Sequence, residues 1–267
     1  MAISVTTKDR ITTIAIKRPE ARNAVDPETS DQLFAAFLAF ETDAGADIAI
    51  LTGDSIAFCA GFDLKVATQR PPQKWLEKYH IPDDWRDPCK DPLPSPMGPA
   101  RLMLSKPVIA AIEGAAVAGG MELALWCSLR IASASAFFGV FCRRWGVPLI
   151  DGGTVRLAQI VGQGRANELI LTGRAIHADE ALRIGLVNEV TEDGQALLAA
   201  VSLAKSLLKF PRACMLADYH NGQMPPRQLA SALRREWQNS AIALQTSVDG
   251  ASKFAAGAGR AGSFGSD

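Results

Sequence analysis

A pair of glycines followed by a carboxylate marks the stretch EGAAVAGGMELAL, residues 113–125. Gly119 and Gly120 come after the apolar run VIAAI and before the helical pattern MELALW, which predicts a strand, a tight turn and a helix. N–H groups at a helix N-terminus lack acceptors within the helix and favour a developing negative charge. Glu122, on the same first turn, could therefore move a proton next to a polarised carbonyl.

Both features also have a purely structural interpretation. The glycines could serve only to let a helix pack closely against a strand. A glutamate in the first turn of a helix commonly complements the helix dipole without touching a substrate. The combination of the two features favours chemistry more than either does alone.

A second glycine-rich turn, AFCAGFDLK at 57–65, directly follows the apolar strand pattern IAILTG at 48–53. Small residues at the exit of a buried strand are typical of the ligand sites of open α/β folds. Two common phosphate motifs are excluded because residues that each requires are absent. Gly120-Met121 stands where a P-loop requires Lys and Ser or Thr, and Gly162-Gln163-Gly164 lacks the third glycine of a dinucleotide fingerprint.

The stretch FFGVFCRRWGVPLIDGG at 137–153 adds a thiol and another carboxylate. Arg143 and Arg144 could lower the pKa of the Cys142 thiol if they face it, but a small apolar filler is the alternative interpretation of Cys142. Asp151 is a second candidate acid. Its structural alternative is a turn or an N-cap for the helical pattern TVRLAQIV.

Composition limits the classes of partner. Lys and Arg total 28, as do Asp and Glu, so no overall basic field indicates nucleic acid. The five cysteines form no CxxC pair, which favours a reducing, cytoplasmic compartment, and the three separated histidines give a metal site little support. No secretory signal is apparent, and the most apolar span, 107–126, contains Glu113 and Glu122, so we expect no membrane span.

Periodicity predicts strands that alternate with helices, and then helices alone. Asp26 is expected to cap a helix that runs from Pro27 to about Thr42. The segment 70–99 holds eight of the fifteen prolines and is expected to be irregular. The pattern as a whole indicates an α/β core followed by a helical C-terminal region. The strands are predicted at 11–16, 48–53, 108–113, 129–133 and 137–141.

Four segments in order resemble the motifs of the crotonase, or enoyl-CoA hydratase/isomerase, superfamily. RPEARNAVD resembles its CoA-contacting turn, AFCAGFDL its first oxyanion segment, and KPVIAAIEGAAVAGGMELAL its second. The block DGGTVRLAQIVGQGRANELILTGRAIHADEALRIGLVNEV resembles the family motif that follows. The resemblance covers most of the chain.

The resemblance implies an α/β fold, with a ββα spiral core at residues 1–200 and a helical C-terminal or oligomerisation region at 201–267. It also implies a homotrimer or a dimer of trimers. The ligand it implies is an acyl-CoA thioester, with coenzyme A as part of the substrate and no separate cofactor.

By the same resemblance, the backbone amides of Phe62 and Gly119 form the oxyanion hole, and Glu122 is the first of two catalytic glutamates. Cys142 stands where hydratases carry the second glutamate, and Asp151 lies on a loop where other members place an Asp near the acyl group. Efficient hydration, which normally uses two carboxylates, is therefore in question, whereas one-base chemistry stays feasible.

The predicted substrate-binding residues are Arg22 and Ala24 in the N-terminal turn, Ala60 and Lys65 around the first oxyanion segment, and Cys142. Lys17 and Arg18 are further candidates for the CoA phosphates, with a solvated surface charge as the alternative for each cation.

Three functions follow in order of preference. The first is an enoyl-CoA hydratase-like enzyme acting through a stabilised enolate, and the second an enoyl-CoA isomerase or another one-carboxylate reaction. A non-catalytic CoA-thioester-binding scaffold is the third, and the intact Glu122 argues against it. The acyl group should be set by residues 70–99, whose sequence does not identify it.

Overall fold

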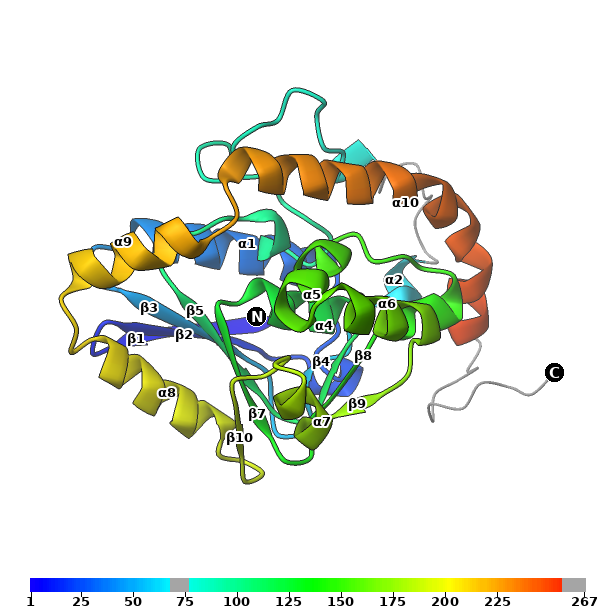
Figure 1. Cartoon of the computed structure of the whole chain (residues 1–267). Helices are drawn as coiled ribbons and strands as arrows, with labels where there is room; N and C mark the ends of the chain where they lie inside the picture. Colours follow the sequence, from blue (N-terminus) through cyan, green and yellow to red (C-terminus); the bar gives the residue numbers. More distant parts are fainter. Residues whose placement is uncertain (68–76, 256–267) are drawn as a thin grey trace.

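The computed structural model describes residues 1–67 and 77–255, which form two sheets surrounded by helices (Figure 1). The six-stranded sheet has the order β1-β2-β3-β5-β7-β10, and the four-stranded sheet the order β4-β6-β8-β9. In the larger sheet β1 and β2 are antiparallel and the remaining neighbours are parallel. Its strands are β1 (Ile3–Lys8), β2 (Ile11–Ile16), β3 (Ile48–Thr52), β5 (Val108–Ile112), β7 (Leu129–Ser133) and β10 (Glu189–Thr191).

From β3 to β8, successive strands alternate between the two sheets, and this alternation builds a spiral. Each strand in the middle of the larger sheet is followed at once by a strand of the smaller sheet and then by a helix. The three units are β3, β4 (Ala57–Cys59) and α2 (Leu64–Ala67); β5, β6 (Ala115–Val117) and α4 (Gly119–Trp126); and β7, β8 (Phe137–Gly139) and the 3-10 helix Phe141–Trp145. This is the repeated strand-strand-helix arrangement that the resemblance predicts.

The central strands β3 and β5 of the larger sheet are buried on both of the faces to which their alternate side chains point. Ile48 and Ile50 belong to a cluster with the alanines of α8 (Ala196–Leu207). Ala49 and Leu51 belong to the main core, together with Leu33 and Phe37 of α1 (Pro27–Thr42). Continuous apolar runs are therefore required in these strands.

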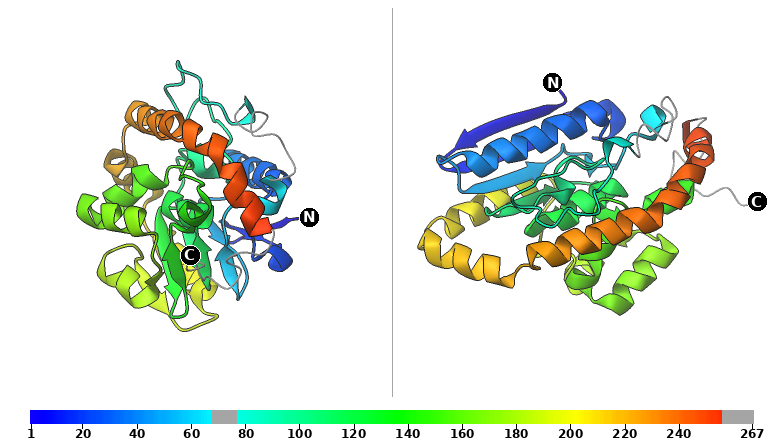
Figure 2. Two further views of the ribbon diagram at one scale, coloured as in Figure 1. Left: turned by 90° about the vertical axis from the view of Figure 1, so that its right-hand side faces the viewer. Right: turned by 90° about the horizontal axis from the view of Figure 1, so that it is seen from above.

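The long C-terminal helix α10 (Pro226–Ala255) crosses the end of the molecule that holds α4 and α5 (Gly153–Val161), as Figures 1 and 2 show. Tyr79 and Trp85 of the proline-rich segment pack in one buried cluster with Leu233 and Trp237 of α10. Residues 68–76 of that segment lie outside the described residues. The remaining elements are α6 (Gln163–Thr172), β9 (Ile176–His177), α7 (Ala178–Arg183) and α9 (Arg212–Gly222).

Most of the predicted elements are confirmed, and α1 begins at Pro27 with Asp26 as its N-cap, as expected. The strand predicted at 137–141 is too long, because it ends at Gly139 and the chain then turns into the 3-10 helix. The two three-residue strands β4 and β6 were not expected, since their residues read as glycine-rich turns. Helix α8 runs across position 200, so the proposed division there stays a prediction.

Within the described residues, no helix is both long and apolar enough to cross a membrane. In that same part of the chain no group of three or more His, Cys, Asp and Glu side chains is arranged to hold a metal ion.

The core packing predicts a contrast between two helical leucines. Leu33 of α1 is fully buried, whereas Leu198 of α8 is 65% exposed. Leu33→Ala should lower the free energy of unfolding by about 2–5 kcal/mol, because it opens a cavity in a close-packed core. Leu198→Ala should change it by less than about 0.5 kcal/mol. Urea unfolding followed by circular dichroism measures both, and similar losses for the two variants would contradict the packing described above.

Candidate active site

The two glycine-rich turns lie backbone against backbone at the ends of the parallel strands β4 and β6. A Cβ atom on Gly120 would overlap the carbonyl oxygen of Cys59, and one on Gly61 would lie 3.0 Å from the backbone nitrogen of Gly119. Glycine is required at these positions because no side chain fits between the two segments. The structure thus brings the segment of Phe62 next to the turn of Gly119.

The turn before α4 has a strained backbone. Ala118 has φ 53° and ψ −126°, a conformation that residues with a Cβ rarely adopt, and its N–H donates to the carbonyl of Gly139 at 2.8 Å. The next two residues, Gly119 and Gly120, begin α4, so their N–H groups have no acceptor within the helix. Strain held in place at a helix start is typical of a site that presents N–H groups to a ligand.

Glu122 extends from α4 to the start of α5. Its Oε1 accepts hydrogen bonds from the backbone N–H groups of Asp151 and Gly153, both at 2.9 Å, and no hydrogen bond from the described residues reaches Oε2. The side chain is buried, and burial raises its pKa well above the usual value, with the nearby charges of Asp151 and Glu236 acting in the same direction. The two N–H groups oppose this rise. Glu122 is therefore a fixed carboxylate that holds a proton more strongly than usual.

Asp151 is buried beside Glu122 and has a different partner. Its Oδ1 accepts from the backbone N–H of Met97 at 3.0 Å, and α5 has no side-chain N-cap, so the N-cap alternative for Asp151 is wrong. Burial raises the pKa of Asp151, while Ser95 and Arg101 lower it. Met97 also covers the turn of Gly119, since a Cβ on Gly119 would lie 2.5 Å from the Met97 Sδ. Asp151 and the turn of Gly119 thus flank one methionine.

A third buried carboxylate, Glu236 of α10, lies at the same helix start. It accepts from the N–H groups of Gly152 at 2.6 Å and Thr154 at 2.9 Å, and from the Thr154 hydroxyl at 2.6 Å. Sequence reasoning missed it because it lies far along the chain in an arginine-rich helix. A signal was present: Glu236 falls on the apolar stripe that Leu229, Leu233 and Trp237 form, where a charge is unexpected.

Two guanidinium groups accompany the three carboxylates. Arg156 donates to the carbonyls of Asp151 at 3.0 Å and Ala100 at 2.7 Å. Arg101 is fully buried, donates to the Tyr79 carbonyl at 2.7 Å, and stacks over the Trp237 ring at 4.8 Å. Because these positive charges lie close to the carboxylates, they offset part of the free energy lost when each charged group is removed from water.

Cys142 lies in the 3-10 helix Phe141–Trp145 and is 8% exposed. Burial raises the pKa of its thiol to about 12, the negative charge of Glu122 adds to this, and Arg143 opposes it only weakly. Arg144 instead stacks on the Phe141 ring at 3.8 Å. These surroundings favour the interpretation of Cys142 as a small neutral filler near Glu122 over that of a reactive thiolate.

The N-terminal turn is joined by backbone hydrogen bonds to the glycine-rich segment that carries Phe62. Ala60 donates its N–H to the Arg22 carbonyl at 3.1 Å, and Val25 pairs with Phe62 in a short parallel bridge. The Ala24 carbonyl accepts from the Arg18 guanidinium. The structure therefore brings Arg22, Ala24 and Ala60 next to Phe62, although their contacts with a ligand stay a prediction.

The candidate phosphate-binding cations differ in their surroundings. Arg18 forms internal ion pairs with Asp26 at 3.0 Å and Asp63 at 3.2 Å, so its charge ties the turn together. Arg22 and Lys17 are exposed, as is Lys65 on α2. Phosphate contacts of these cations stay a prediction.

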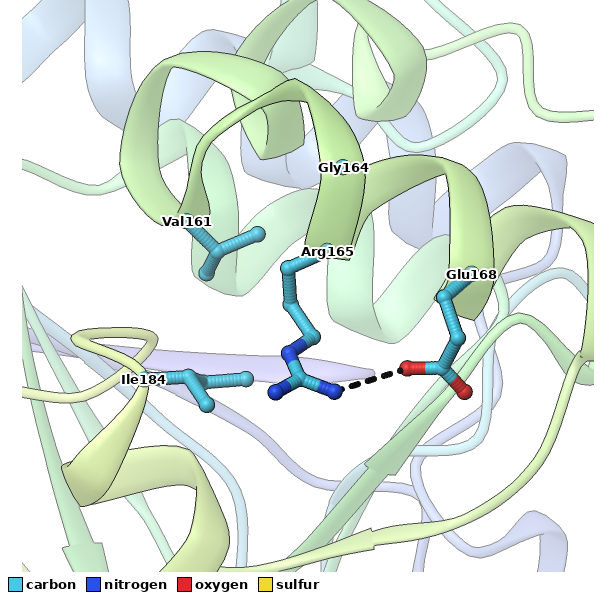
Figure 3. Close-up of a pocket in the computed structure, with 5 residues that line it drawn as sticks. All are labelled: Val161, Gly164, Arg165, Glu168 and Ile184. Carbon is cyan, nitrogen blue, oxygen red and sulfur yellow. Dashed lines mark hydrogen bonds and ion pairs between the residues drawn. The ribbon is translucent and has the colours of Figure 1, made fainter.

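A surface cavity of about 510 Å³ opens between the end of α5 and α6 (Figure 3). Its lining includes the Arg165–Glu168 ion pair at 3.3 Å and contains none of the predicted site residues. It carries no group that the chemistry above would use.

Comparison with known proteins decides the family. A sequence model described as enoyl-CoA hydratase/isomerase matches residues 6–255. The chain belongs to the enoyl-CoA hydratase/isomerase family. Its fold is the crotonase-like ββα spiral with C-terminal helices, and it is an enzyme of this hydratase/isomerase class.

Named relatives are similar over most of their length. Enoyl-CoA hydratase EchA19 of Mycobacterium tuberculosis is 37% identical over 73% of this chain and 70% of its own. (E)-Benzylidenesuccinyl-CoA hydratase of Thauera aromatica is 34% identical over 78% of this chain and 76% of its own. The crystal structure of enoyl-CoA hydratase EchA16_2 from Mycobacterium paratuberculosis superposes with a TM-score of 0.73 at 35% identity, covering 93% of this chain and 99% of that one.

The environment of the cysteines predicts their reactivity. Cys142, Cys59 and Cys127 are buried with thiol pKa values near 12, whereas Cys214 is exposed. A raised pKa leaves almost no thiolate at about pH 8, so iodoacetamide should alkylate Cys214 in the folded protein long before Cys142. Peptide mass spectrometry measures this, and unfolding in urea should make all five cysteines react. Fast alkylation of Cys142 in the folded protein would instead support a thiolate at that position.

Proposed function

We propose that the chain acts on an acyl-CoA thioester by forming an enolate, with the N–H groups of Phe62 and Gly119 as the oxyanion hole and Glu122 as the acid/base group. The observation that carries this proposal is the placement of Glu122: a buried carboxylate of raised pKa, three residues after Gly119, fixed through one oxygen and open at the other. Each oxyanion donor supplies about 3 kcal/mol, and a positioned acid/base group roughly 100- to 10,000-fold in rate.

Hydration of an enoyl-CoA would proceed with balanced protons. The oxygen of water bonds to Cβ and gives its proton to Glu122, while the electrons of the double bond move through Cα onto the thioester oxygen. Cα then takes a proton as the enolate collapses. Glu122 can return its own proton, or Asp151, whose pKa burial also raises, can supply one.

Isomerisation is the alternative, and the residue at position 142 favours it. Glu122 would remove the proton from one carbon and return it two carbons along, so that the double bond shifts with a single base. Cys142 supports this alternative because a buried thiol of pKa about 12 does not replace a glutamate as a proton carrier near neutral pH. A scaffold that binds CoA thioesters without reaction would have no use for the fixed Glu122.

The remaining features of the proposal follow the family. Arg22, Ala24, Ala60 and Lys65 would contact the CoA moiety, which arrives as part of the substrate, so no separate cofactor is proposed. The acyl group would lie beside Met97, Cys142 and Asp151. A trimer or a dimer of trimers, a cytoplasmic location and the absence of a nucleic-acid partner stay predictions.

Glu122→Gln tests the central role. The Gln side-chain oxygen can still accept the N–H groups of Asp151 and Gly153, so the loop should keep its place while proton transfer is lost. We expect kcat to fall roughly 100- to 10,000-fold, with acyl-CoA affinity within a few-fold of wild type. Absorbance assays with a 2-enoyl-CoA for hydration and a 3-enoyl-CoA for isomerisation measure both reactions. Binding of acyl-CoA with no turnover by the wild-type protein in either assay would support the scaffold instead.

Cys142→Glu tests the absent second carboxylate. If hydration is limited by the lack of an acid at this position, the variant should hydrate a short 2-enoyl-CoA at least about ten times faster than wild type, because a positioned carboxyl group contributes at that level or above. Cys142→Gln is the matched control, equal in size but unable to exchange a proton, and should show no such gain. Equal rates for the two variants would show that position 142 does not limit hydration.

A further inference from the structure

The start of α5 presents four consecutive N–H groups, and two carboxylates from distant helices share them alternately. Glu122 of α4 takes the N–H groups of residues 151 and 153, and Glu236 of α10 takes those of residues 152 and 154. All four bonds are between 2.6 and 2.9 Å. Because successive N–H groups of one turn point to different carboxylates, neither glutamate can shift without moving the other's donors.

We propose that Glu236 is a positioning residue for the reaction, which holds the turn whose N–H groups aim Glu122 at the substrate. This inference rests on the proposed acid/base role of Glu122. Glu236 itself does not touch the reacting atoms.

The turn needs an external anchor because its own residues give it little rigidity. Gly152 has φ 87°, and a Cβ on Gly153 would lie 2.8 Å from Oε1 of Glu122. Close approach of Glu122 therefore requires glycine at 153, yet adjacent glycines leave a backbone conformationally free. The three hydrogen bonds to Glu236, including that from the Thr154 hydroxyl, supply the missing restraint.

The same arrangement couples the charges. Glu236 faces Glu122 of α4, Asp151 of the loop and Arg156 of α5, and Arg101 approaches from the other side under Trp237. The negative charge of Glu236 raises the pKa of Glu122. Removing that charge should therefore lower the pKa of Glu122, so that its basic form persists to lower pH.

Glu236→Gln in the full-length enzyme tests the proposal. We expect kcat to fall roughly 10- to 100-fold, the size of effect that small misplacement of a catalytic group produces, with KM within about three-fold. The acid limb of the pH–kcat/KM profile should move to lower pH. Hydrogen exchange measured by mass spectrometry should increase in the peptide that contains residues 151–154.

Glu113→Gln is the matched control. Glu113 is also a buried glutamate that accepts two backbone N–H groups, from Gly194 and Ala196, at the start of a helix far along the chain. It caps α8, away from Glu122. Glu113→Gln should lower the stability of the protein and its protection from hydrogen exchange near residues 194–196. It should keep the kcat and the pH profile of wild type.

If Glu236→Gln behaves as Glu113→Gln does, with lower stability alone, then Glu236 is only structural and the proposal is overturned. Unchanged exchange at 151–154 in Glu236→Gln would overturn the anchoring itself, whatever the activity. Failure of the proposed function is a separate result, because Glu122→Gln would then be as active as wild type.

Should Glu236→Gln not fold, Thr154→Ala removes one of the three bonds from an exposed position. Thr154→Ala should change kcat and the hydrogen exchange of residues 151–154 in the direction expected for Glu236→Gln, but by a smaller factor. Thr154→Ser, which keeps the hydroxyl donor, should restore both, and the absence of any difference between the two variants would count against the proposal.

Discussion

The desolvation of three carboxylates around one helical turn is the constraint on which the site depends. An ionised carboxylate away from water is strongly unfavourable unless it is paired and hydrogen-bonded. A helix N-terminus offers several N–H groups that have no acceptor of their own, and the start of α5 offers them at the place where α4 and α10 meet. Glu122 and Glu236 divide these N–H groups, while the guanidinium groups of Arg101 and Arg156 add positive charge. The helices are fixed relative to one another, because moving any of them would leave a buried charge without its hydrogen-bond or ion-pair partner.

The hydrogen bonds and opposite charges offset the desolvation of these carboxylates only in part, and the chemistry of the site follows from this. The N–H groups lower the pKa of Glu122, yet burial and the neighbouring carboxylates raise it further, so that the balance favours holding a proton. Such a group can take a proton from carbon or water and release it again. The Cys142 thiol stays neutral because burial raises its pKa to about 12, so the proposed reaction relies on carboxylates.

The sequence was informative where a property repeats along the chain, and much less so where a contact joins distant segments. The apolar runs of β3 and β5 and the cap of α1 by Asp26 are local signals, and the structure confirms them. Strands β4 and β6 were missed because segments of only three residues become strands through pairing with each other. The motif that contains Glu122 was visible in the sequence, but the partners of Glu122 were not. Tertiary packing brings the N–H groups of residues 151 and 153, and the side chain of Glu236, next to it. The ion pairs of Arg18 with Asp26 and Asp63 are likewise set by tertiary packing and were not visible in the sequence.

The position of Glu236 near the end of the chain also bears on how the protein is made. Most of the strands of both sheets and the turns that carry Gly61, Gly119 and Glu122 precede it by more than a hundred residues, so they leave the ribosome first. Until α10 emerges, the N–H groups of Gly152 and Thr154 lack their carboxylate acceptor, and the apolar face of Tyr79 and Trp85 lacks its cover. Contacts of such long sequence separation form late, because loop closure must precede them. The start of α5 thus acquires this anchor only after α10 has been synthesised.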